Sequence, residues 1–343
     1  MTRSAALIVI NYRTAKLAVD AIRSARAATS DPLQVVVVDN SVDTAQAAAL
    51  APHADTLIVA ERNLGYAAAI NRARAQCDAQ VLVVSNPDVV FGANAVDVLH
   101  DVDAAVAGPA MFWDDAYEWM LPGAELQTGS QVFGRALATR FAPWARIRDR
   151  RRIRARLAFW SLKETTEVDA LSGSVLAITA SAFDRAGGFD ERFPLYFEEN
   201  DFLRRVGGRI VYVPRAECRH IYNQSAGDSA DAAMLYATSE REYLEKWNGR
   251  FIAAALKKLE RPEKPPVVTT IGDEPIHVPP NVAVEASPLP SFDMAAGHFP
   301  RGSSVTIPQA IWQSYRAPEL YLRVIDRATA AVLATYARSK MRV

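Results

Sequence analysis

Short apolar runs, each three or four residues long, recur along the first part of the chain. They are Leu7–Ile10, Val35–Val38, Leu57–Val59 and Val81–Val84. Runs of this length, rich in β-branched residues and bounded by polar ones, are typical of strands buried on both faces of a parallel sheet. A helix that crosses a bilayer needs ~20 apolar residues, so none of these runs is a transmembrane segment. The pattern therefore predicts a parallel sheet inside a covered core.

Helix-like stretches separate these runs, at Ala15–Ala28, Thr44–Leu50 and Tyr66–Gln76. Because parallel strands are joined by right-handed crossovers, the alternation predicts an α/β fold with a doubly wound, mostly parallel sheet flanked by helices. In such sheets ligands bind at the carboxyl ends of the strands. Polar residues that directly follow each strand are therefore the first candidates for a functional site.

The regular alternation is interrupted after the fourth run. Apolar periodicity resumes at Leu171–Ile178, and a helix at Asn200–Val206 is expected to precede a strand at Arg209–Val213. One long helix, Ala230–Leu259, is expected to close the main domain.

Proline becomes frequent from Arg261 to Pro290, which excludes a helix there and indicates a linker followed by short strands. Two apolar segments that flank Arg327–Thr329 predict a β-hairpin, although their alanines also permit a helix. We therefore expect a main domain over residues 1–260, a linker over 261–280 and a small, β-rich C-terminal module over 281–343.

Composition and charge exclude several classes of protein. Half of the 343 residues are hydrophobic and 23% are charged, as in ordinary globular proteins. Thirty-nine basic residues balance thirty-nine acidic ones, so the general attraction to phosphate expected of a nucleic-acid binder is absent. Cys77 and Cys218 are too few for a disulfide framework or a thiolate zinc site. With no signal-peptide pattern at the amino terminus, these features predict a cytoplasmic protein without a nucleic-acid partner.

The glycine-rich signatures of P-loop and dinucleotide-binding proteins are absent from the sequence. Instead, carboxylates and amides follow successive strands. They are Asp39 and Asn40 after the second strand, Asn63, Gly65 and Asn71 after the third, and Asn86 and Asp88 after the fourth. Each alone could be an ordinary turn residue or helix cap. Their recurrence at three strand ends favours a shared ligand site.

Six motifs follow one another along the chain. They are IVINYRT, VVVVDNS, NLGYAAAINRA, VSNPDVVF, GSVLAITASAFDRAGGFDE and FEENDF, and His220 comes after them. Their order and spacing resemble family 2 glycosyltransferases of the GT-A fold, and within them the rhamnosyltransferase-like branch that builds bacterial surface polysaccharides. The resemblance covers residues 5–250 and leaves the C-terminal module unmatched. It implies a GT-A type sheet and transfer of a sugar from a nucleotide donor with inversion.

The resemblance assigns several residues to the nucleotide. Asp39 is implied to hydrogen-bond the pyrimidine ring, where an Asx-turn is the ordinary alternative. Gly65 is implied to let the backbone approach the ligand, where a turn at the start of a helix is the alternative. The complete implied set of nucleotide-binding residues is Asn11, Arg13, Asp39, Asn63, Gly65, Asn71 and Asn86.

The resemblance also implies a metal site. Asn86-Pro87-Asp88 stands where the family has an Asp-x-Asp motif, so Asp88 becomes the main carboxylate ligand of Mg²⁺ or Mn²⁺. His220 matches a histidine that completes the metal site or touches the diphosphate in some members, although a single histidine is often a core residue. The cation would offset the charge of the departing diphosphate.

The acidic cluster FEENDF precedes a short helix, and neighbouring carboxylates raise one another's pKa, which suits a general base. The base of the family maps to Glu199, with Asp201 as the second candidate. Acids at the start of a helix are also favoured by the helix dipole without any catalytic role.

Seven arginines lie between Arg146 and Arg156, in a segment flanked by tryptophans. A solvated helical face is the ordinary interpretation. Arginines beside aromatic residues also suit lipid headgroups or the diphosphate of a lipid-linked acceptor. The candidates for acceptor or membrane contact are Trp144, Arg148, Arg151, Arg152 and Trp160.

The first hypothesis is an inverting, metal-dependent glycosyltransferase that uses a dTDP- or UDP-sugar, with L-rhamnose from dTDP-rhamnose as the favoured donor. Its acceptor is a glycan or lipid-linked glycan, reached through peripheral contact with the cytoplasmic membrane surface. A sugar-phosphate nucleotidyltransferase is an alternative on the same fold, but it needs a glycine-rich basic loop after the first strand, and IVINYRTAKL has no glycine. A catalytically inactive glycan-binding or scaffolding protein is the second alternative.

Overall fold

The computed structural model describes residues 4–221, 230–259, 266–315 and 317–339. The chain forms two compact units. The first comprises residues 1–110, 124–126 and 163–247, and the second comprises residues 111–123, 127–162 and 248–343. The second unit therefore includes a stretch from the middle of the chain as well as the C-terminal residues. The expected division into a main domain, a linker and a module stays a prediction.

The sheet of the first unit begins with four parallel strands in the order β3-β2-β1-β4. Their bounds are β1 Ala5–Asn11, β2 Leu33–Asp39, β3 Thr56–Val59 and β4 Val81–Ser85. Each predicted apolar run lies in one of these strands, and β1, β2 and β4 are mostly buried because both faces of the sheet are covered. Asn11 pairs with Asp39, so the polar ends of β1 and β2 meet.

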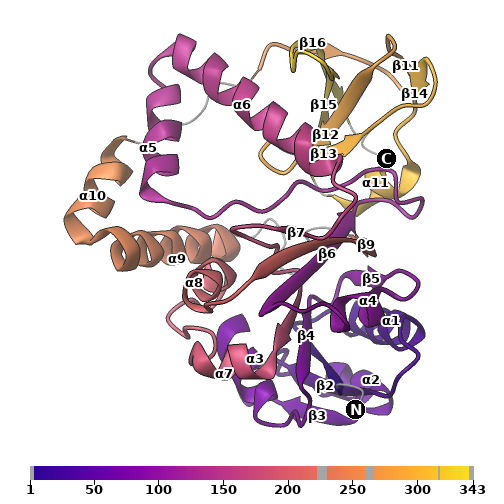
Figure 1. The fold of residues 1–343 in the computed structure, drawn as a ribbon, viewed down its shortest axis with the longest axis vertical. Coiled ribbons are helices and arrows are strands. Elements are labelled where there is room, and N and C mark those ends of the chain that lie inside the picture. Colours follow the sequence, from indigo (N-terminus) through magenta and orange to yellow (C-terminus); the bar gives the residue numbers. More distant parts are fainter. Residues whose placement is uncertain (1–3, 222–229, 260–265, 316, 340–343) are drawn as a thin grey trace. The chain divides into compact units, whose positions relative to one another are not determined.

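Helices cover both faces of these strands (Figure 1). The helices α1 (Ala15–Ala27) and α2 (Thr44–Leu50) lie on one face, and α3 (Tyr66–Arg74) lies on the other. This change of face follows from right-handed crossovers, because the chain moves outward from β1 to β3 and then returns to β4. The predicted α/β, doubly wound architecture is confirmed, and the strand order reverses between β1 and β4.

Further strands extend this sheet beyond β4 in the order β8, β6, β9 and β5, and β7 pairs with β9. The expected strands after residue 170 correspond to β8 and β9, and the sheet is mixed here because β8 runs antiparallel to both β4 and β6. The bounds are β5 Val89–Phe91, β6 Val106–Phe112, β7 Thr166–Glu167, β8 Val175–Thr179 and β9 Ile210–His220, with α4 Ala95–His100, α7 Ala180–Arg185 and α8 Glu198–Arg205 between them.

The single helix predicted over Ala230–Leu259 is wrong, because the structure has two helices there. The first, α9 (Ala230–Asn248), ends just before Gly249, and α10 (Arg250–Leu259) follows that residue. Gly249 has a φ of +83°, a left-handed conformation that glycine adopts without steric cost and that ends a helix. The apolar periodicity continues on both sides of this residue, so the pattern alone did not reveal the break.

The second unit contains a five-stranded sheet in the order β10-β16-β15-β12-β13 and a separate pair of strands, β11 and β14. The predicted hairpin around Arg327–Thr329 is confirmed as the antiparallel pair β15 and β16. The strands are β10 Thr269–Thr270, β11 Ile276–His277, β12 Val282–Ser287, β13 Ala296–His298, β14 Ser304–Val305, β15 Glu319–Asp326 and β16 Val332–Ser339, and the helices besides α10 are α5 Gly129–Ala138, α6 Ala142–Trp160 and α11 Gln309–Ser314. In the described ranges, no helix combines the length and the apolar character that a bilayer crossing requires.

Candidate active site

Asp39 ends β2 and is fully buried. Its Oδ1 atom accepts hydrogen bonds from the Asn11 amide at 2.9 Å and from the backbone N–H of Ser41 at 3.0 Å. Its Oδ2 atom has no hydrogen-bond partner among the described residues. Since a buried acceptor without a partner is costly, this oxygen is suited to accept an N–H from a ligand. Asn11 is itself buried and acts behind Asp39, holding it in place.

The loop after β3 is held at the start of α3 by two asparagines. Asn63 accepts a hydrogen bond from the backbone N–H of Gly65 at 2.9 Å, and Asn40 donates one to the Gly65 carbonyl at 3.1 Å. Gly65 has a φ of +82°, and a Cβ there would lie 2.8 Å from the Pro194 carbonyl oxygen. Glycine is therefore required here because the backbone of Pro194 comes so close. The backbone N–H of Tyr66 donates a hydrogen bond to the Pro194 carbonyl at 2.6 Å.

Asp88 directly precedes β5 and His220 ends the neighbouring strand β9, so the two residues come together. The Asp88 carboxylate is buried, and its Oδ1 lies 3.3 Å from Nε2 of His220. The strand register that pairs Val89 with His220 places the two side chains here. Asn86 lies two residues before Asp88 and accepts a hydrogen bond from the Tyr66 hydroxyl at 2.9 Å. The predicted metal residues are thus adjacent to the start of α3.

Glu198 and Glu199 occupy the first turn of α8, after two residues with left-handed backbone. Tyr196 and Phe197 have φ values of +69° and +67°, which cost ~1–3 kcal/mol each and are typical of functional sites. Glu198 is buried, whereas Glu199 is half-buried and can meet an incoming substrate. Glu199 packs on Gly173, where a Cβ would come within 3.2 Å of its side chain.

Negative charge is concentrated around Tyr66. Burial and then the charges of Glu198, Glu199 and Asp88 raise the pKa of the Tyr66 hydroxyl. Burial also raises the pKa of Glu199, and burial followed by the charge of Glu199 raises the pKa of Glu198. The charges of these three carboxylates therefore act on the same tyrosine, although the three do not form a metal-binding group within the described ranges.

The donor set fits a hard divalent cation that also binds a ligand. Within the described ranges, no group of three or more histidine, cysteine or acidic residues forms a metal cage. Asp88 and His220 nevertheless supply two ligands side by side, and Mg²⁺ commonly binds one or two carboxylates together with substrate phosphates. Oε2 of Glu198 is buried and has no hydrogen-bond partner in the described part of the chain.

Comparison with known proteins identifies the family. The sequence model described as "Glycosyl transferase family 2" matches residues 6–108. An N-acetylglucosaminyl-diphospho-decaprenol L-rhamnosyltransferase of Mycobacterium tuberculosis is 32% identical over 228 residues, which cover 58% of this chain and 70% of the relative. The chain belongs to glycosyltransferase family 2. The resemblance that the motifs carry is therefore confirmed, including its rhamnosyltransferase-like character.

Solved structures resemble this glycosyltransferase more distantly. A mannosyltransferase of Pyrobaculum calidifontis in complex with GDP-Man and Mn²⁺ is 16% identical, with a TM-score of 0.44 and coverage of 75% of this chain and 74% of that chain. The S. aureus TarS fragment 1-349 in complex with UDP is 13% identical, with a TM-score of 0.43 and coverage of 75% and 69%.

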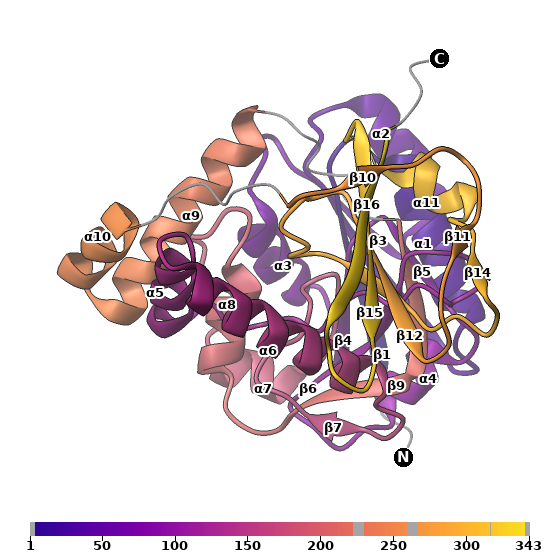
Figure 2. The ribbon, with the colours of Figure 1, turned by 90° about the horizontal axis from the view of Figure 1, so that it is seen from above.

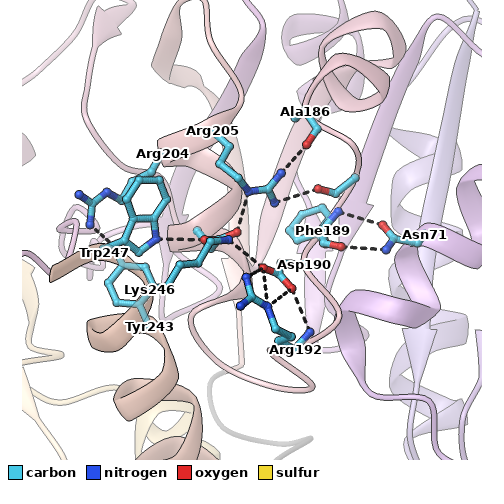
Figure 3. A network of polar contacts seen from close by, with 12 residues as sticks. Asn71, Ala186, Phe189, Asp190, Arg192, Arg204, Arg205, Tyr243, Lys246 and Trp247 are labelled. Atoms are coloured by element: carbon cyan, nitrogen blue, oxygen red, sulfur yellow. Dashed lines mark hydrogen bonds and ion pairs between the residues drawn. The ribbon is translucent and has the colours of Figure 1, made fainter. Parts of the chain in front are cut away.

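The side-chain amide of Asn71 binds the protein backbone in this glycosyltransferase, whereas a role in nucleotide binding was expected for it. Its Nδ2 donates to the Phe189 carbonyl at 2.9 Å, and its Oδ1 accepts the Phe189 N–H at 2.9 Å (Figure 3). Both polar atoms of the amide are therefore occupied by the loop before α8, so Asn71 is a structural clamp in this structure. Arg13 lies at the exposed rim, with its guanidinium 5.2 Å from the centre of the Tyr12 ring.

Asp201 is completely buried, and both of its carboxylate oxygens are occupied. Oδ2 binds Arg205 Nε at 2.7 Å, and Oδ1 binds Trp247 Nε1 at 3.0 Å and Lys246 Nζ at 2.5 Å. An oxygen held by cations is a poor proton acceptor for a substrate. Of the two candidate bases, the geometry therefore favours Glu199 and gives Asp201 the task of anchoring α8 to α9.

The candidates for acceptor or membrane contact lie in the second unit, and two of them are internal. Trp160 is 1% exposed and donates Nε1–H to the Leu121 carbonyl at 3.2 Å, and Arg152 forms an ion pair with Asp293. Trp144 is half-buried and donates to the Gly134 carbonyl at 3.0 Å, whereas Arg148 is half-buried and Arg151 is exposed. The expectation that Trp160 and Arg152 face a membrane is corrected, because their contacts are made within the unit.

Sequence reasoning missed two residues of this enzyme's site, Tyr66 and Glu198. Tyr66 stands inside the NLGY motif, and its hydroxyl joins α3 to Asn86. Glu198 belongs to the FEENDF cluster, in which roles are predicted from the sequence for Glu199 and Asp201. Two adjacent glutamates at one helix start were the available signal that both belong to the candidate site.

Proposed function

We propose that this glycosyltransferase moves a sugar from a pyrimidine nucleotide to a hydroxyl of a glycan acceptor, with inversion at the anomeric carbon. The observation that supports the proposal is that two features lie at one edge of the sheet, the free oxygen of Asp39 and the carboxylates around Tyr66. An acceptor oxygen of Asp39 is available there, and Asn40 and Gly65 connect it to the carboxylates around Tyr66. The first feature suits a nucleobase and the second suits the reacting end of the donor.

L-Rhamnose from dTDP-rhamnose is the proposed donor group, and a lipid-linked glycan is the proposed acceptor. The support is the mycobacterial relative, whose name specifies L-rhamnose transfer to N-acetylglucosaminyl-diphospho-decaprenol. Thymine and uracil both carry a ring N–H that Asp39 Oδ2 can accept, whereas the available oxygen offers nothing specific to a sugar. Guanine carries such an N–H as well, so the pyrimidine class rests on the family resemblance at Asp39, and the sugar rests on the relative.

Asp88 and His220 would hold Mg²⁺ or Mn²⁺, and the bound cation would offset the negative charge of the leaving diphosphate. Glu199 accepts the proton of the acceptor hydroxyl. The hydroxyl oxygen then forms a bond to the anomeric carbon from the face opposite the nucleotide, while the bond from that carbon to the diphosphate oxygen breaks. The nucleoside diphosphate leaves with the bonding electrons, so no covalent enzyme intermediate is needed.

A donor panel tests the proposal. The protein is incubated with polyprenyl-diphospho-N-acetylglucosamine, Mn²⁺ and one of dTDP-L-rhamnose, UDP-glucose or GDP-mannose, and the lipid product is measured by mass spectrometry. We expect a single rhamnose addition from the dTDP donor, loss of product with EDTA, and no product from the purine donor. If no donor gives product and no nucleotide diphosphate binds, the proposal is wrong and the inactive glycan-binding alternative is favoured.

A further inference from the structure

Three helices of the second unit expose an unusual number of large apolar side chains. On α10, Phe251 is 90% exposed and Ile252 is 57% exposed. The others are Phe133 on α5, Phe141 at the start of α6 and Ile147 on α6, each about half exposed. Single apolar residues on a surface are ordinary, but several on adjoining helices indicate an interaction site.

Of the three helices, α5 adjoins both α6 and α10, as Figures 1 and 2 both show. Leu256 of α10 is buried beside α5, where a Cβ at Gly129 would lie 3.6 Å from its Cδ1 atom. The Trp144 indole joins α6 to the Gly134 carbonyl of α5, and Arg140, beyond α5, donates to the Leu259 carbonyl at 3.2 Å. The inner sides of these helices are thus used for packing, and the apolar residues above lie on their outer sides.

The arginines of α6 are divided between its two sides. On the inner side, Arg156 is buried and pairs with Glu285 of β12 at 3.2 Å. On the outer side, Arg146, Arg151 and Arg154 are exposed and form no ion pair within the described ranges. They follow one another around Ile147 at roughly helical spacing, so the outer side of α6 is both basic and apolar.

Acidic residues are almost absent from these helices. Together α5, α6 and α10 carry eight arginines and two lysines in addition to Arg250, but Asp149 is their one acidic residue. Asp149 binds Arg323 of β15 at 3.0 Å and is therefore engaged on the inner side of α6. Nothing on these helices neutralises the outer arginines locally.

We propose that the outer sides of α5, α6 and α10, called the helical face below, bind an anionic lipid bilayer. Exposed arginines attract lipid phosphates, and phenylalanine and isoleucine side chains enter the boundary between headgroups and acyl chains. Phenylalanine can stack on bases, but the aliphatic Ile147 and Ile252 gain nothing from a nucleic acid, so the combination favours a membrane. This proposal rests on the proposed function, because a lipid-linked acceptor lies in a membrane, and binding the membrane would bring the enzyme to that acceptor.

Vesicle sedimentation tests the helical face without donor or acceptor. The probe is phosphatidylglycerol–phosphatidylcholine vesicles, with pure phosphatidylcholine vesicles for comparison. We expect F251S/I252S to lower the partition coefficient about tenfold or more, because two large apolar side chains are lost from the boundary. R146Q/R151Q/R154Q should lower it on the order of a hundredfold at low salt and much less near 1 M salt, where the Debye length falls to ~3 Å.

The matched control is V332S/L333S, which removes two apolar side chains of β16 that are 40% and 51% exposed on the same unit. This variant should bind vesicles like the parent. Equal binding of the parent, F251S/I252S and R146Q/R151Q/R154Q would overturn the proposal, and so would equal binding of the parent to both vesicle types. A parent that binds vesicles but transfers no sugar to a short-chain acceptor would contradict the proposed function and leave the helical face intact, so the two failures are distinguishable.

Discussion

Asp39 divides its carboxylate between two tasks. One oxygen is fixed by Asn11 and the Ser41 N–H, and the other is left for a ligand. We expect Asp39→Asn to keep the fixed oxygen and to turn an amide N–H toward the nucleobase N–H, which replaces a hydrogen bond by a repulsion. The affinity for dTDP or UDP should fall about 10- to 100-fold, as for loss of a hydrogen bond to a charged group.

Isothermal titration with dTDP and Mn²⁺ measures this loss. Asp101→Asn, at an exposed helix end whose carboxylate pairs with His100, should bind like the parent. An unchanged dissociation constant for dTDP in Asp39→Asn would mean that Asp39 does not bind the nucleobase and only forms an Asx-turn.

The proposed metal site depends mainly on the carboxylate of Asp88. Its buried carboxylate lies beside His220, and no other residue of the Asn86-Pro87-Asp88 motif offers a charged ligand. We expect Asp88→Ala to abolish the part of donor binding that depends on Mn²⁺ and His220→Ala to weaken it, because the first removes the anionic ligand. Titrations of dTDP with and without Mn²⁺ check this. Equal Mn²⁺ dependence in the parent and Asp88→Ala would contradict the assignment.

The helix α8 depends on ionic contacts that hold its strained first turn. Asp190, in the loop before α8, binds Arg192 at 2.6 Å and Lys246 of α9 at 2.8 Å. The hydrogen bond from Arg192, followed by that from Lys246, holds the pKa of Asp190 well below its usual value. A lowered folded-state pKa stabilises the fold above the unfolded pKa of ~3.9, and this contribution is lost as the pH falls through the folded-state pKa.

Asp190→Asn should therefore be less stable than the parent at pH 7. The Arg192 side chain is largely exposed, so we expect a small effect, a fall in Tm of about 2–4 °C, and the difference should shrink below pH 4. Thermal unfolding followed by circular dichroism between pH 7 and pH 3 measures it. A difference that grows as the pH falls would mean that the Asp190 contacts are not the source of the stability.

The sequence predicted the architecture of the first unit well because its strands carry a strong local signal. Val35–Val38 and Val81–Val84 lie inside β2 and β4, and both faces of each strand are buried as their composition requires. The break at Gly249 was missed because it depends on one backbone torsion. Local patterns thus predicted β1 to β4 and the helices between them, but the end of a later helix depended on a single residue.

The site was predictable as a set of strand ends, but the direction of each side chain was not. Asp88 and His220 meet because strand register brings together residues far apart in the chain. Asn71 and Asp201 are also an amide and a carboxylate, like the other candidates. Their polar atoms nevertheless bind Phe189, Arg205 and other protein groups. The arginines of α6 likewise divide between a buried sheet and the helical face, which depends on partners such as Glu285 that lie more than a hundred residues later.

The most direct test of the whole account compares Glu199→Gln with Asp201→Asn. Transfer of rhamnose from dTDP-rhamnose to the lipid-linked acceptor is measured beside donor affinity for both variants and the parent. Loss of a general base lowers the rate ~10²- to 10⁴-fold, so we expect Glu199→Gln to bind donor like the parent and to lose transfer to that extent. We expect Asp201→Asn to lower Tm because it removes the charge held by Arg205 and Lys246, while its folded fraction still transfers sugar. Transfer by Glu199→Gln at the rate of the parent would contradict the account.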